Sequence, residues 1–131
     1  MKRDMDLIRN ILLAFENSAS QRISLKSLSI EGASEHEIDF HVQLLKEAGF
    51  IDHHIVRPES RTGIKFLASF DTGMRLTMNG YDFLESIRDK DVWERTKAGA
   101  KTVGNASLGF IWEIAKGFGK QLVKDKLGIE I

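Results

Sequence analysis

The spacing of apolar residues changes from a helical to a strand pattern between residues 34 and 70, and this change fixes the fold class. Ser34 followed three residues later by Glu37 is a capping box, in which each side chain pairs with the other residue's free backbone N–H. The helix that begins there runs to Gly49, where a left-handed C-terminal cap is expected. Farther along, apolar residues alternate from Ile64 to Phe70, as in a strand with one buried face. The sequence therefore predicts an α+β fold.

The same rules predict elements on both sides of this region. We expect a helix at 4–16 with Asp4 as its N-cap, a minimal strand at 23–25 followed by a helical turn, strands at 50–56 and 64–70, a turn at 71–73, a third short strand at 74–76, and further helices capped by Thr77 and Asp91. The chain has a single proline, Pro58, in the polar loop between the two longer strands. Several helices and a small antiparallel sheet or hairpin result.

Composition excludes several classes of protein. The 131 residues include 19 Lys and Arg against 19 Asp and Glu, for a net charge of +0, and 42% of the residues are hydrophobic. This supports one packed domain with an appendage and does not favour a disordered chain. With 0 cysteines the chain has no disulfide framework and no thiolate metal site. Neither a membrane-spanning run nor a signal peptide is predicted, so we expect a cytoplasmic protein.

The order of the predicted elements is that of a winged helix-turn-helix domain, and two stretches add detail. Leu44–Ile51 resembles the end of the second motif helix running into the wing, whose tip holds Glu59–Arg61. Leu76-Thr77-Met78-Asn79-Gly80 resembles the Leu-Thr-x-x-Gly signature that leaves the wing in bacterial regulators of the multiple-antibiotic-resistance (MarR-like) type. This resemblance covers residues 34–85 and implies a winged helix-turn-helix core.

Several stretches spread along the chain also resemble a bacterial and phage family known as a domain of unknown function. They are Met1–Leu13, Leu76–Leu84, Ile87–Asp89, Val92–Glu94 and Lys97. This resemblance implies a winged-helix-like core with a trailing helix, in bacteria or their prophages. It implies no activity, ligand or site residue.

We expect three parts in the chain: a winged-helix-like domain at 1–97, a linker at 98–107 and a C-terminal amphipathic helix at 108–131. Three glycines weaken that helix, so it must bury its apolar stripe against a packing partner. The stripe consists of Leu108, Ile111, Trp112, Ala115, Phe118 and Leu122. It packs either on the chain's own first helix or across an interface, with a homodimer or another protein as partner. A membrane partner is not expected.

Charge is unevenly distributed, and this bears on DNA binding. Between Ser34 and Val56 there are five acidic residues and one basic residue, Lys46. Since a helix-turn-helix inserts its second helix into the groove of a polyanion, the acidic helix 34–48 disfavours DNA reading. Basic residues lie before this helix and in the wing. The candidate phosphate contacts are Arg22, Lys26, Arg57, Arg61 and Lys65.

No pattern indicates catalysis or metal binding. His36 and His41 are five residues apart, a spacing that does not align two imidazoles on one helix face. No phosphate-binding glycine loop or nucleophile elbow is present, so we expect neither an enzyme nor a cofactor. The leading hypothesis is a regulatory or adaptor module for protein interaction. The alternative is a DNA-binding transcriptional regulator that contacts phosphates through a basic wing.

Overall fold

A computed structural model describes residues 1–56, 70–104 and 106–128 of the chain. Within these ranges the fold is α+β, as predicted, with five α-helices, one short 3-10 helix and a two-stranded antiparallel sheet. The chain forms two compact units, Met1–Thr77 and Met78–Ile131. Among the described residues, none of the helices is long and apolar enough to cross a membrane.

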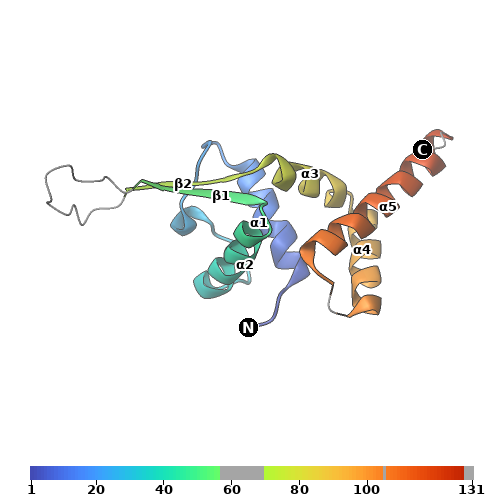
Figure 1. The fold of residues 1–131 in the computed structure, drawn as a ribbon, viewed down its shortest axis with the longest axis horizontal. Helices are drawn as coiled ribbons and strands as arrows, with labels where there is room; N and C mark the ends of the chain where they lie inside the picture. The colour runs from blue at the N-terminus through green and yellow to red at the C-terminus, as the bar shows by residue number, and fades with distance from the viewer. Residues whose placement is uncertain (57–69, 105, 129–131) are drawn as a thin grey trace, which may run out of the picture. The chain divides into compact units, whose positions relative to one another are not determined.

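The first unit contains three helical elements and the sheet (Figure 1). In chain order these are α1 (Met5–Asn17), η1 (Leu25–Ser27), α2 (Glu35–Glu47), β1 (Ile51–Val56) and β2 (Phe70–Leu76). The side chain of Asp4 caps α1 by accepting hydrogen bonds from the backbone N–H groups of Asp6 and Leu7. The capping box of Ser34 and Glu37 is present at the start of α2, and Gly49 follows its end with a φ of 83°. These local predictions are confirmed.

The core of the first unit lies between α1, α2 and the sheet. Both helices bury residues at helical spacing, including Ile8, Ile11 and Leu12 from α1 and Val42 and Leu45 from α2, all with 0% exposure. Burying such a side chain stabilises a fold by about 1.5–3 kcal/mol. The two helices are therefore held by their apolar faces, while their outer faces are left for solvent or a partner.

The sheet differs from the prediction in its second strand. The chain does not turn at 71–73; instead β2 continues through these residues and pairs with β1 from Ile51↔Leu76 to Val56↔Phe70. The ladder has a register irregularity between His53 and Ile55, opposite the stretch of β2 in which Gly73 has a positive φ of 92°, as in a β-bulge. The predicted turn and separate third strand are therefore wrong. The predicted strand at 64–70 lies outside the described residues except for Phe70.

The minimal strand predicted at 23–25 is reduced to a single bridge. The backbone N–H of Ile23 donates to the carbonyl of Met74 over 2.9 Å, and the N–H of Met74 donates back over 2.7 Å. A Cβ on Gly73 would lie 3.1 Å from the carbonyl oxygen of Ile23. Glycine at this position therefore allows the chain before η1 to approach the sheet.

The second unit consists of α3 (Met78–Ile87), α4 (Lys90–Val103) and α5 (Leu108–Leu127). Asp89, and not the predicted Asp91, caps α4 by accepting from the N–H of Val92. The segment 98–107, predicted as a linker, is helical up to Val103, and Gly104 ends the helix with a φ of 91°. Packing offsets the cost of Gly99, since a Cβ there would lie 3.4 Å from Ile114 of α5. The two compact units divide between Thr77 and Met78, whereas the boundary predicted from the sequence is at residue 97.

Candidate partner-binding surface

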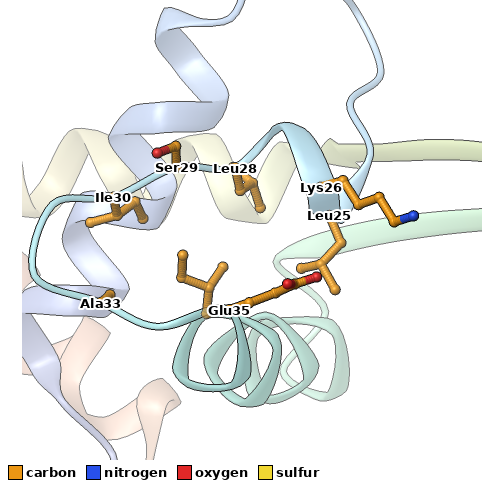
Figure 2. Close-up of a pocket in the computed structure, with 8 residues that line it drawn as sticks. Leu25, Lys26, Leu28, Ser29, Ile30, Ala33 and Glu35 are labelled. Atoms are coloured by element: carbon orange, nitrogen blue, oxygen red, sulfur yellow. The ribbon is translucent and has the colours of Figure 1, made fainter.

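A surface hollow of about 360 Å³ lies between η1, the segment that follows it and the start of α2. Its lining is mixed: Ile38 and Leu28 are buried and Leu25 and Ile30 are half-buried, while polar groups make up the larger part of its accessible surface. Lys26, Ser29 and Glu35 supply its polar edge. Figure 2 shows Glu35 directed toward η1, where Leu25 lies, whereas Lys26 extends away from Ile30 and Ala33. The hollow thus combines recessed apolar side chains with a carboxylate at its edge.

The outer surface of α2 next to this hollow is acidic. Glu35 and Glu47 are exposed and Asp39 is half-buried, one turn after Glu35. The one basic residue of the helix, Lys46, places its amine 3.0 Å from Nδ1 of His53. This lysine is therefore held toward the sheet, and the exposed residues of α2 are Glu35, His36, Gln43 and Glu47, with no Lys or Arg among them.

Lys46, His53 and Asp71 form a polar network that the sequence did not indicate. Nε2 of His53 lies 2.9 Å from the carboxylate of Asp71, on the opposite side of the ring from Lys46. The hydrogen bond that the backbone N–H of Gly73 donates to Asp71, and then the one from His53, lower the pKa of Asp71 below its usual 3.8. The three residues come from α2, β1 and β2, and no sequence motif joins them. The network ties the end of α2 to the sheet.

Of the predicted phosphate contacts, Arg22 and Lys26 are within the described residues, and Arg57, Arg61 and Lys65 lie outside them. Arg22 donates to the carbonyl of Gly73 over 3.3 Å and lies 3.5 Å from the carboxylate of Asp52. Arg75 shares that carboxylate at 3.6 Å. The charge of Arg22 is thus partly compensated within the protein, while Lys26 remains exposed at the edge of the hollow.

The histidines lie in different environments. His41 is 1% exposed, with Nε2 accepting from the backbone N–H of Asp4 over 2.7 Å and Nδ1 lying 2.7 Å from the carbonyl of Glu37. His36 is exposed on the same helix, and His54 pairs with Thr72 across the strands. In the described part of the chain, no three His, Asp or Glu side chains gather as a metal site would require.

The apolar stripe of α5 packs inside the second unit, on α3 and α4. Leu108, Ile111 and Ala115 are buried there, with 6%, 0% and 0% exposure. The ring of Trp112 meets that of Phe83 edge to face at 6.1 Å between centroids. Phe118 and Leu122 are half-buried. Residues predicted to meet a partner therefore serve first to hold α5 to its own unit, because the helix needs that contact to be stable.

Comparison with known proteins gives the family. The model of the family described as "Hypothetical protein (DUF2513)" matches residues 2–106. The chain belongs to the DUF2513 family. A Haemophilus influenzae protein named "Uncharacterized protein" is 32% identical to this DUF2513 chain over 117 residues, which is 88% of this chain and 93% of the relative. No solved structure matches. The family match includes the hollow, the acidic face of α2 and the Lys46–His53–Asp71 network, and it ends just before α5.

Proposed function

We propose that this DUF2513 protein is a regulatory or adaptor module that binds another protein through the acidic face of α2 and the hollow beside it. The observation that carries the proposal is the combination of exposed carboxylates on α2 with a hollow next to them that polar and apolar side chains line together. A hollow that joins apolar side chains to charged ones suits a protein interface, where a buried anchor supplies affinity and charge supplies orientation.

The arrangement of the first unit supports a winged-helix scaffold for this role. Its order is helix, bridge at Ile23, 3-10 turn, helix, strand, strand, and the bridge to Met74 stands where a third strand would pair. In winged-helix regulators the helix in the position of α2 reads the major groove. Carboxylates at that position repel phosphates, so the scaffold is better suited here to a basic protein surface. This step rests on analogy of fold.

Site-specific photo-cross-linking in the native bacterial cell tests the proposal. A photoreactive phenylalanine replaces Ser29 at the edge of the hollow, and the matched control replaces Thr102, which is also exposed, on α4. We expect a protein adduct from position 29 and none from position 102. The double change Glu35→Lys and Asp39→Lys should abolish the adduct, because it reverses the charge beside the hollow.

A test of DNA binding can contradict the proposed protein-binding function. We expect no measurable binding of the purified protein to mixed-sequence duplex DNA at low salt. Binding that weakens steeply with salt would overturn the proposal in favour of a DNA-binding regulator, because such a slope reports phosphate contacts. In that case Arg61→Ala and Lys65→Ala should flatten the slope. Recovery of DNA but no protein from position 29 would lead to the same conclusion.

A further inference from the structure

The three residues after η1 form a short extended segment with an unpaired backbone. Leu28 has strand-like backbone angles, with a φ of −81° and a ψ of 109°. Leu28 is buried, Ser29 is exposed and Ile30 is half-buried, which is the alternation of an extended chain. Among the residues that the structure describes, neither the backbone N–H nor the carbonyl of Ser29 has a hydrogen-bond partner. Unpaired groups on an extended segment are a template for pairing with another chain.

Open space adjoins this segment. Leu28, Ser29 and Ile30 line the hollow of about 360 Å³, and Figure 2 shows them across from Glu35 at the start of α2. A second hollow, of about 450 Å³, also has Leu28 and Ser29 in its lining. Volumes of this size are within the range of pockets that hold ligands. The first unit therefore leaves room for a peptide beside Ser29.

The charge of the first hollow favours one kind of peptide. Glu35 is exposed and forms no ion pair with any residue in the described part of the chain. Asp39 lies one helical turn farther along α2. Lys26, the other charged residue of the lining, extends away from Ile30. A Lys or Arg side chain on a bound peptide would therefore meet an opposite charge at Glu35.

We infer that an extended basic segment of another protein pairs with Leu28–Ile30 and places a Lys or Arg side chain against Glu35. The backbone of Ser29 exchanges hydrogen bonds with the peptide, as one residue of a ladder does. In this mode of recognition main-chain bonds give affinity and side-chain contacts give specificity. The mixed lining of the hollow suits it, because a peptide brings polar backbone and side chains together. The inference rests on the proposed function, since it names the binding mode and partner chemistry of the same surface.

Selection from a phage library of random peptides on the immobilised full-length protein supplies the probe. We expect enriched peptides to combine Lys or Arg with β-branched residues and to lack proline in the paired stretch. One enriched peptide is then synthesised with each backbone nitrogen methylated in turn. Because successive N–H groups of a strand point to opposite sides, methylation should raise the Kd by about tenfold or more at alternate positions only.

Variants of the protein separate backbone pairing from side-chain contact. Ser29→Pro removes the N–H and should raise the peptide Kd by about tenfold or more, whereas Ser29→Ala keeps it and should bind like the wild type. Glu35→Lys should raise the Kd by about tenfold because it repels the basic peptide. Its matched control is Glu47→Lys, the same charge change at the exposed far end of α2, which should bind like the wild type.

Circular dichroism with the wild-type thermal midpoint confirms that each variant is folded. If Ser29→Pro does not fold, the methylated peptides decide the matter on the wild-type protein. Hydrogen exchange of the Ser29 amide, followed by NMR, gives a direct measurement. We expect fast exchange in the free protein and exchange slowed by about tenfold or more in the complex, because the peptide then accepts this hydrogen bond.

Four outcomes overturn the inference. They are a Ser29 amide that is already protected in the free protein, a methylation series without alternation, binding that Glu35→Lys does not weaken, and a library that yields no binding peptide. A helical partner would give the second outcome. The proposed function is tested separately, because a protein adduct from position 29 in the cell would support it even where the extended pairing fails.

Discussion

One imidazole connects the start of α1 with α2. Because the backbone N–H of Asp4 can only donate, Nε2 of His41 must accept, and the ring proton is then on Nδ1, where it is donated to the carbonyl of Glu37. Both bonds are 2.7 Å long, and the ring is 1% exposed. A neutral ring of one tautomer satisfies both partners, so this histidine is structural.

Replacing this ring tests its role. We expect His41→Ala to lower the free energy of unfolding by about 1–3 kcal/mol, since part-buried backbone groups lose their partner and a cavity is left where the buried ring was. The matched control is His36→Ala on the same helix, where the side chain is exposed and the change should stay within about 0.5 kcal/mol. Urea denaturation followed by circular dichroism measures both. Equal effects would contradict this role for His41.

The ionisation of Asp71 makes the stability of the folded state depend on pH. Its pKa lies below the usual 3.8, first because the backbone N–H of Gly73 donates to it and then because His53 does. The ionised carboxylate therefore stabilises the folded state at pH values above 3.8, and this contribution is lost as the pH falls through the folded-state pKa.

An NMR titration of the Asp71 carboxyl carbon checks this. We expect a midpoint below 3.8 in the wild type and a partial rise in His53→Ala, because the larger contribution from Gly73 remains. The stability difference between the wild type and Asp71→Asn should shrink as the pH is lowered below 3.8. A wild-type midpoint above 3.8 would show that these hydrogen bonds do not stabilise the ionised carboxylate of Asp71 in solution.

At the scale of elements, glycines play opposite roles in β2 and α5. Gly73 has a φ of 92°, and a Cβ there would lie 3.1 Å from a backbone oxygen. Gly117 has helical geometry with nothing within 4 Å of such a Cβ. The first glycine is required by the bridge between Ile23 and Met74, whereas the second only weakens its helix.

The same substitution should therefore have opposite effects at these two sites. We expect Gly117→Ala to raise the free energy of unfolding by up to about 1 kcal/mol, because alanine is the better helix former. Gly73→Ala should lower it by about 1–2 kcal/mol or more, since a left-handed conformation is costly for any residue with a Cβ. Thermal and urea denaturation of both variants provide the measurement. Stabilisation by Gly73→Ala would mean that the close approach of Ile23 to the sheet is not maintained in solution.

At the scale of the molecule, the chain is neutral in total but not in its parts. The 19 basic and 19 acidic residues cancel, while carboxylates gather on α2 and lysines recur on α5. Each unit also has a core of its own, centred on residues such as Leu45 in the first and Ile111 in the second, both 0% exposed. Charge is thus grouped by helix, whereas packing is organised by unit.

Separate cores predict separate losses of protection. Leu45→Ala and Ile111→Ala should each cost about 2–5 kcal/mol, as large-to-small changes in a core do. In hydrogen exchange measured by mass spectrometry, we expect each variant to exchange faster mainly in its own unit, because opening can be confined to one cooperative unit. Equal acceleration in both units would instead show that the two cores unfold as one.

The sequence by itself determined the elements that depend on neighbours a few residues away. The cap at Asp4, the capping box at Ser34 and the amphipathic helices follow from local hydrogen bonds and periodicity. Local signals predicted the ends of helices less well: Asp89 and not Asp91 is the cap of α4, and packing on α5 extends α4 into the predicted linker as far as Val103. A helix can continue for another turn or more past a glycine when a tertiary contact offsets the cost of that glycine.

Only the tertiary structure decided which distant side chains meet. His53 reaches Asp71 across 18 residues, and His41 reaches Asp4 across 37. The predicted turn at 71–73 shows why such pairs escape prediction: a one-residue irregularity in a ladder sends every following side chain to the other face. The spacing along the chain records which residues share a face of one element. Which faces meet depends on strand register and on how the helices pack, and those are settled by the energy of the whole core.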